Sequence, residues 1–158
     1  MKKIGIALII LVIVSFFFIF PFGHKEFSST IEEESQILTK DLEKKIRLAF
    51  GDKEILILLE NNNSSRAFYD RLPLELEFKD YARTEKVTDL SEPLPKLEGN
   101  FGYDPKLGDF AYYAPWEGLV LYYKDFRYST GIIKLGVVIE GVENLKDMEG
   151  IVLVSKEN

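Results

Sequence analysis

The stretch GDFAYYAPWEGLVLYY, residues 108–123, decides the fold because it holds two strand-like runs around a break. Residues 109–113 and 119–123 are rich in aromatic and branched side chains, which favour β-strands. Pro115 and Gly118 stand between the two runs and interrupt the extended backbone. The stretch therefore predicts two short strands separated by a turn.

A β-hairpin and a further strand pair are predicted upstream of this stretch. Residues 45–50 alternate apolar and polar side chains, Gly51-Asp52 follows, and residues 55–59 resume the apolar run, which is typical of a hairpin. Residues 74–79 alternate apolar and charged side chains, which predicts a strand with one face exposed to water. Residues 84–90 are the expected partner of this strand.

Short helices and a loop are expected between these strands. The Asn and Ser residues at 61–65 can cap a short helix over residues 66–71, which Pro73 ends. Residues 91–107 are rich in Pro and Gly and predict a long surface loop. Residues 144–148 predict one helical turn.

Two more strand-like runs, residues 132–139 and 151–154, complete the pattern downstream. They are separated from their neighbours by glycines at 131, 141 and 150. Many short strands of this kind predict a β-barrel or a β-sandwich.

The N-terminus predicts attachment to a membrane. Lys2 and Lys3 precede residues 4–22, a run of 19 residues without a charge. As a helix this run would span roughly 28 Å, close to the hydrocarbon core of a bilayer. The lysines are expected to stay in the cytoplasm, which places the rest of the chain outside the cell membrane as a single-pass protein. Cleavage of the run as a signal sequence, which would secrete the domain, is the alternative.

We therefore expect three segments. Residues 1–23 form the anchor or signal sequence, residues 24–44 form a juxtamembrane spacer and helix, and residues 45–158 form the folded β-domain. The expected helix carries apolar side chains at helical spacing, among them Ile31, Leu38 and Leu42.

Composition excludes several classes of function. Of 20 Lys and Arg residues, 18 follow the apolar run and face 26 acidic residues, so this part carries a formal charge of −8 and repels nucleic acid. The chain has no cysteine, and its one histidine is His24 beside the apolar run, so Ser-His-Asp and Cys-His catalysis lack essential groups. We predict no metal site, no nucleotide loop and no cofactor.

Several strings of residues form a recognisable pattern: in order, they are LPLEL at 72–76, GYDP at 102–105, GDFAYYAPW at 108–116, YYKDF at 122–126 and LG at 135–136. Together these strings resemble the small bacterial cyclophilin-like family. The resemblance covers roughly residues 45–154 and implies a small closed β-barrel of the cyclophilin type with one or two short helices. It implies no defined molecular role, because fold similarity alone does not establish activity.

Peptidyl-prolyl isomerisation is the one enzymatic alternative. It needs no nucleophile or metal, and Arg83 or Arg127 beside the many aromatic residues could supply a hydrogen bond and an apolar pocket. The strings that carry the active residues of cyclophilin isomerases have no match here, so no catalytic residue is assigned.

A belt of aromatic residues is the remaining candidate site. Its rings, if exposed, would suit a peptide, a glycan or an envelope protein, whereas the alternative is that they fill the barrel. Trp116 is the first residue to test, because a large ring in a turn is hard to bury. The hypothesis is that the domain is a binding module displayed at the membrane. The alternatives are the isomerase and an accessory domain with only a structural role. The candidate ligand-binding residues are Tyr112, Tyr113, Trp116, Tyr123, Asp125, Arg127 and Tyr128.

Overall fold

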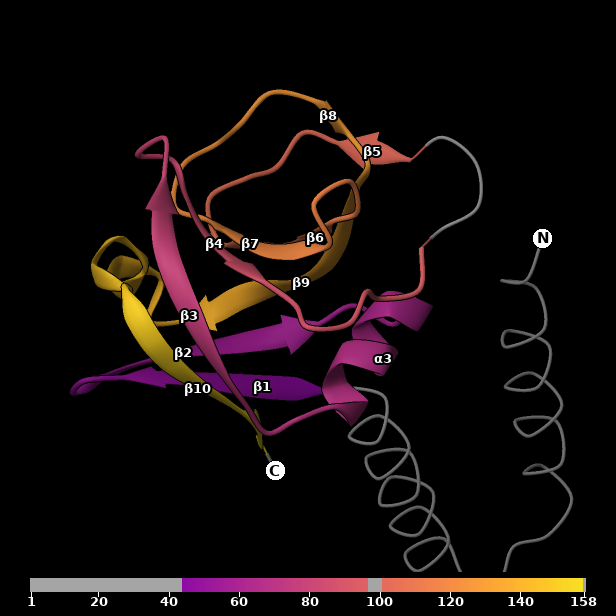
Figure 1. The fold of residues 1–158 in the computed structure, drawn as a ribbon. Coiled ribbons are helices and arrows are strands. Elements are labelled where there is room, and N and C mark those ends of the chain that lie inside the picture. The colour runs from indigo at the N-terminus through magenta and orange to yellow at the C-terminus, as the bar shows by residue number, and fades with distance from the viewer. Residues whose placement is uncertain (1–43, 97–100, 158) are drawn as a thin grey trace, which may run out of the picture. The chain divides into compact units, whose positions relative to one another are not determined.

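Eight antiparallel strands close into a barrel in the computed structural model, which describes residues 44–96 and 101–157 (Figure 1). The strand order around the barrel is β1-β10-β3-β4-β7-β6-β9-β2, and β5 and β8 form a separate two-stranded sheet. This confirms the predicted mainly-β closed barrel. The elements are β1 Lys45–Phe50, β2 Lys53–Leu59, α3 Asn63–Asp70, β3 Leu74–Tyr81, β4 Glu85–Asp89, β5 Gly102–Tyr103, β6 Asp109–Tyr113, β7 Gly118–Tyr122, β8 Ser129–Thr130, β9 Ile132–Glu140, η1 Val142–Asp147 and β10 Gly150–Glu157.

The predicted hairpin is formed by β1 and β2. Its six residue pairs run from Lys45–Leu58 to Phe50–Lys53, and Gly51 adopts the positive φ of +56° that the tight turn requires. Alternate side chains of β1 are buried, which matches the apolar positions of the sequence.

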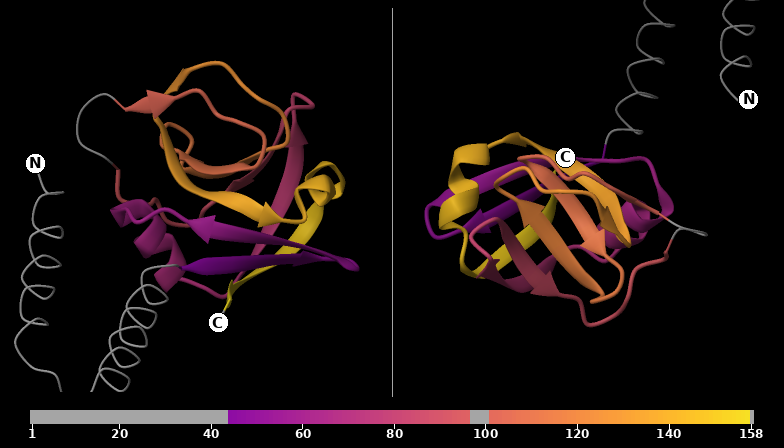
Figure 2. Two further views of the ribbon diagram at one scale, coloured as in Figure 1. Left: turned by 180° about the vertical axis from the view of Figure 1, so that it is seen from behind. Right: turned by 90° about the horizontal axis from the view of Figure 1, so that it is seen from above.

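The helix α3 begins three residues earlier than predicted. The side-chain oxygen of Asn62 accepts a hydrogen bond from the Ser65 amide at 2.9 Å, so Asn62 is the N-cap and Asn63 the first helical residue. Phe68 on this helix is fully buried, with its ring centroid 5.5 Å from that of Phe110. The helix and η1 lie on opposite sides of the barrel, as both views show (Figure 2).

Strand alternation divides the apolar residues into an inner and an outer cluster. The inner cluster fills the barrel and contains Phe110, Tyr112, Leu119 and Leu121. The residues between them on β6 and β7 point outward and form a second cluster, which Tyr103 of β5 and Phe126 cover. The outer cluster consists of Ala111, Val120, Tyr122 and Ile132.

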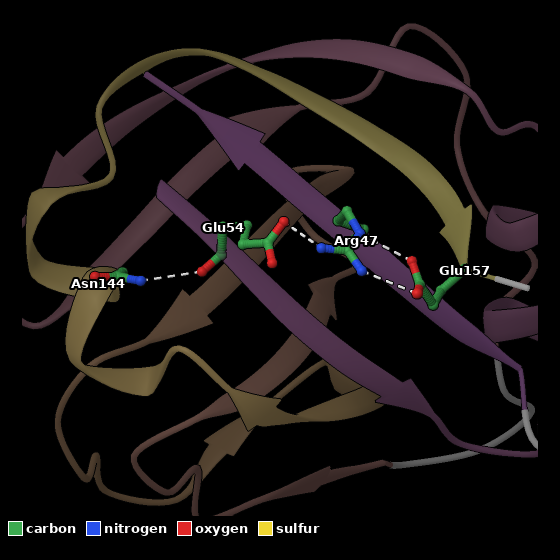
Figure 3. Close-up of polar contacts among 4 residues, drawn as sticks. All are labelled: Arg47, Glu54, Asn144 and Glu157. Atoms are coloured by element: carbon green, nitrogen blue, oxygen red, sulfur yellow. Dashed lines mark hydrogen bonds and ion pairs between the residues drawn. The ribbon is translucent and has the colours of Figure 1, made fainter. Parts of the chain in front are cut away.

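An arginine clamp joins the outer faces of three strands (Figure 3). The guanidinium group of Arg47 on β1 donates two hydrogen bonds to Glu157 of β10, at 2.8 and 2.9 Å, and contacts Glu54 of β2. These hydrogen bonds lower the pKa of the Glu157 carboxyl. Asn144 of η1 donates to the Glu54 carbonyl oxygen at 3.0 Å and ties η1 to the hairpin.

The long loop predicted over residues 91–107 contains the short strand β5, and residues 97–100 lie outside the described part. The apolar run 4–22 and the helix expected within residues 24–44 also precede the described residues. In the part of the chain that the structure describes, no helix has the length and apolarity needed to cross a membrane.

Candidate functional site

Three aromatic rings pack together on the outer face of the barrel, and two of them are exposed. The Trp116 ring lies edge-on to Tyr113, with centroids 5.0 Å apart, and to Tyr81, with centroids 5.6 Å apart. Trp116 is 57% exposed and Tyr81 is 46% exposed, while Tyr113 is partly buried beneath them. We call these three residues the aromatic stack.

Two turns place the rings of the aromatic stack. The Trp116 amide donates to the Tyr113 carbonyl at 3.2 Å, and Glu117 follows with a positive φ of +55°, so the β6–β7 turn folds sharply. Tyr81 ends β3 immediately before a turn in which Ala82 and Arg83 both have positive φ. The stack therefore joins the tips of two hairpins.

A buried carboxyl group lies in the strand next to the stack. Glu85 pairs with Tyr81 across the β3–β4 hairpin and with Tyr122 of β7, and it is only 8% exposed. Burial raises the pKa of the Glu85 carboxyl, an effect that the Tyr122 hydroxyl partly opposes. Within the described residues, its Oε2 atom has no hydrogen-bond partner.

The phenol groups nearby are held in their neutral form. Burial raises the pKa of Tyr122, and the negative charge of Glu85 raises it further. Burial also raises the pKa of Tyr103, with the Asp109 carboxylate as the second cause. Asp109 itself is buried and forms an ion pair with Lys134 at 2.7 Å. Asp109 is 4% exposed in this pair, whereas the Lys134 side chain is 35% exposed.

A cleft opens in the barrel wall between β3 and β4. The two strands pair only at their turn end, through Lys79–Val87, Asp80–Lys86 and Tyr81–Glu85. Beyond these pairs the two strands separate (Figure 1). Residues of both strands line a cleft of about 390 Å³. The cleft is lined by Leu74, Glu75, Leu76, Glu77, Lys79, Val87, Thr88, Asp89 and Ser91.

An ion pair occupies the inner side of the same hairpin. Lys86 points into the barrel with its side chain 3% exposed, and its Nζ lies 3.0 Å from Asp80. Asp80 also accepts a hydrogen bond from the Tyr123 hydroxyl at 2.7 Å. Burial and this carboxylate raise the pKa of Tyr123 to about 12. The group stabilises the hairpin that carries Tyr81.

The structure separates the predicted candidate residues into three sets. Tyr112 and Tyr123 point into the barrel and belong to the inner cluster, and the Tyr112 hydroxyl accepts a hydrogen bond from the Leu94 amide at 3.2 Å. Tyr113 and Trp116 lie together on the outer face, where the turn leaves Trp116 exposed as expected.

The other three candidates lie in the segment between β7 and β8, apart from the aromatic stack. Asp125 accepts a hydrogen bond from the Leu107 amide at 3.0 Å and pairs with Lys106 at 3.4 Å. The Arg127 guanidinium lies 5.8 Å from the Phe126 ring centroid. Tyr128 is 58% exposed. The contacts of Asp125 and Arg127 hold this segment in place. Ligand binding by the segment stays a prediction.

Tyr81 is not among the candidate residues predicted from the sequence. The strand predicted over residues 74–79 ends two residues short of the observed β3. Extending the alternation by those two residues places Tyr81 on the same outward face as Glu77 and Lys79, so a longer strand would have found it. As for metals, residues 44–96 and 101–157 contain no group of three acidic, His or Cys side chains arranged to hold an ion.

Comparisons with known proteins assign the family. The sequence model of the cyclophilin-like family matches residues 48–157. The chain belongs to the cyclophilin-like family. This confirms the resemblance that the sequence strings indicated, and the match spans β1 to β10 except for the first residues of β1.

A solved structure shares the fold of this cyclophilin-like protein. The solution structure of the hypothetical protein AF2241 from Archaeoglobus fulgidus aligns with a TM-score of 0.61 over 73% of this chain and 96% of that chain. The two sequences are 20% identical, so the likeness concerns the fold. No curated protein matches the sequence.

Proposed function

We propose that this cyclophilin-like domain is a binding module, held on the outer side of a cell membrane by residues 4–22. It would capture an envelope protein or peptide through the aromatic stack of Tyr81, Tyr113 and Trp116, and a glycan is the other ligand that such rings suit. The membrane part of the proposal is supported by the charge-free apolar run behind two lysines.

The exposure of the aromatic stack is the observation that carries the proposal. Trp116 and Tyr81 leave about half of their surfaces in water although the barrel has an inner cluster that accepts such rings. Tyr and Trp are the residue types that most often dominate protein interfaces, because they bury a large rigid area at low entropic cost. The edge-to-face contacts hold the rings in place before a partner arrives.

Charged groups border the aromatic stack and give it a polar rim. Lys96 and Glu117 form an ion pair at 3.5 Å next to Trp116, with about half of each side chain exposed. Arg83 is exposed in the turn that follows Tyr81. An apolar centre with a polar rim is the usual anatomy of a binding surface.

The single tryptophan makes the proposal directly testable. Because Trp116 is the only tryptophan in the chain, its fluorescence reports on the aromatic stack without background from other sites. Proteins captured by the full-length chain from detergent-solubilised membranes would be identified, purified and titrated against it. We expect the Trp116 emission to shift to shorter wavelength as the ring loses contact with water.

Two variants separate the aromatic stack from other exposed rings. Trp116→Ala should keep the fold, measured by circular dichroism, and weaken capture at least tenfold, since central aromatic residues contribute about 2 kcal/mol or more at interfaces. Tyr128→Ala, which removes an equally exposed ring outside the stack, is the matched control. An equal loss of capture in both variants, or capture unchanged by Trp116→Ala, would count against the aromatic stack as the binding site.

Prolyl isomerase activity remains the enzymatic alternative, and it is tested separately. A proline-peptide isomerisation assay on the full-length chain, with Arg127→Ala as the variant, would reveal it. Activity that this variant abolishes would replace the binding module with an enzyme. No activity and no captured partner would favour the accessory domain with only a structural role.

A further inference from the structure

The cleft between β3 and β4 exposes strand edges that no described strand covers. From Leu74 to Phe78, β3 pairs with β10 on one edge, and β4 pairs with β7 as far as Asp89. Their mutual pairing stops at Lys79–Val87. Because each strand carries hydrogen-bonding groups on both edges, the cleft sides of residues 74–77 and 88–89 present backbone donors and acceptors to whatever enters.

Free strand edges of this kind add an extended chain as a further strand. Natural proteins usually blunt such an edge with a proline, a bulge or a covering loop. Pro73 stands just before β3, and no register shift interrupts the pairing of β3 with β10. The edge is therefore regular over the whole length of the cleft.

The alternation of the strands sorts the cleft side chains by chemistry. The inward-facing residues Leu74 and Leu76 form an apolar floor, and Thr88 of β4 faces the same side. The outward-facing lining residues of β3 and β4 are three carboxylates, Glu75, Glu77 and Asp89, together with Val87 and Lys79. Lys79 is the one basic residue among the described residues that line the cleft, and its Nζ lies 3.7 Å from Glu77.

The neighbouring strand extends this acidic surface with apolar area. Ile151 and Leu153 on β10 lie directly opposite Glu77 and Glu75 and are 63% and 45% exposed. The aliphatic stems of Lys and Arg side chains can cover such residues while their charged ends reach carboxylates. The surface around the cleft therefore suits long basic side chains.

We propose that the β3–β4 cleft binds an extended polypeptide segment as an added strand, with Lys or Arg side chains facing outward and Val, Ile or Thr side chains facing the apolar floor. The inference goes beyond the proposed function because it uses residues that are absent from the aromatic stack. Either site can fail while the other one binds.

The charge of the cleft argues for a foreign basic segment as its occupant. A second copy of this chain would bring a body with a formal charge of −8 toward the carboxylates. Residues 24–43 of the same chain contain six acidic and two basic residues, so they carry the wrong sign as well.

Labelled synthetic peptides test the proposal on the full-length chain in nonionic detergent micelles. The probe is a fluorescent eight-residue peptide in which Lys and Val alternate, measured by anisotropy with empty micelles as the blank. A peptide with Glu in place of Lys should bind at least tenfold more weakly. The Lys-Val peptide with alternate backbone nitrogens methylated, in both possible registers, should also lose at least tenfold because it cannot complete the strand ladder.

Charge-reversal variants locate the binding site. Glu75→Lys combined with Glu77→Lys should weaken binding of the Lys-Val peptide at least tenfold. The control, Glu143→Lys combined with Glu149→Lys, makes the same change of net charge at two exposed positions outside the cleft. Trp116→Ala should leave binding of this peptide unchanged, which separates the cleft from the aromatic stack.

Several results would overturn the inference. Equal loss in both double variants would mean that only the net charge attracts the peptide, and undiminished binding of the methylated peptides would exclude strand addition. A dimer that the cleft variant disrupts, with no peptide binding, would make a second copy the occupant. If the double variant does not fold, Glu77→Gln and the peptide series decide the question by the same criteria.

Discussion

Two pairs of consecutive tyrosines divide between the inner and outer faces of one barrel wall. Tyr112 and Tyr113 end β6, and Tyr122 ends β7, with Tyr123 directly after it. Tyr112 and Tyr123 point inward and are part of the core, whereas Tyr113 and Tyr122 point outward. The outward rings again differ, because Tyr122 is buried and Tyr113 supports the exposed Trp116. Neighbouring residues of the same type therefore pack inside the barrel on one face and against other parts of the chain on the other.

Replacing one ring on each face should produce the largest difference in the free energy of unfolding. Tyr112→Ala removes a fully buried ring and should lower the free energy of unfolding by about 3–5 kcal/mol, the usual cost of emptying a core position. Trp116→Ala should change it by at most about 1 kcal/mol, since over half of this side chain is already in water. Urea unfolding followed by far-ultraviolet circular dichroism measures both. Similar losses would mean that Trp116 belongs to the core.

Ion pairs on the two faces sharpen the comparison. Asp80→Asn leaves the inward Lys86 ammonium group, which is 3% exposed, without its charged partner, so the thermal midpoint should fall clearly. Glu117→Gln breaks the exposed outer pair with Lys96 and should have little effect, because exposed pairs contribute under about 1 kcal/mol. An equal fall in both variants would show that Lys86 reaches solvent.

Two glutamates should make the stability of the fold depend on pH in opposite directions. The hydrogen bonds of Arg47 lower the pKa of Glu157, so its stabilisation is present above the ordinary Glu pKa and is lost as the pH falls through the lowered value. Burial raises the pKa of Glu85, so its charge costs stability as the pH rises through the raised value.

Glutamine variants measured across the pH range check both signs. Glu157→Gln should lower the thermal midpoint at about pH 7, and the difference from the unmodified chain should shrink toward about pH 3. Glu85→Gln should raise the midpoint at about pH 8 more than at about pH 4. A Glu85→Gln effect that does not vary with pH would mean that this carboxyl is solvated in the folded chain.

The smallest expected effect concerns the turn that presents Tyr81. Arg83 has a φ of +56°, a conformation that costs a non-glycine residue about 1–2 kcal/mol. Arg83→Gly relieves that strain but adds backbone entropy to the unfolded chain, so we expect a net gain of up to about 1 kcal/mol. The urea midpoint measures it, with Lys124→Gly in the β7–β8 segment as the comparison. A loss of stability would show that the arginine side chain contributes more than the strain costs.

The sequence by itself determined most of the strands, and its resemblance to a family implied that they close into a barrel. The alternation in residues 45–50 and 74–79 and the aromatic runs at 109–113 and 119–123 match observed strands, because a strand with one buried face needs apolar side chains at every second position. Turn residues such as Gly51 marked where strands end. The motif strings identified the family that the comparison over residues 48–157 confirms.

Only the tertiary structure decided which faces and edges remain open. Alternation divides Tyr112 from Tyr113 but does not say which face is inside, and it does not reveal that the segments around β5 and β8 cover Tyr122 while Trp116 stays exposed. The contact of Tyr81 with Trp116 joins residues of two separate hairpins. The β3–β4 cleft likewise depends on where strand pairing stops, which is set by packing around the whole barrel and not by either strand alone.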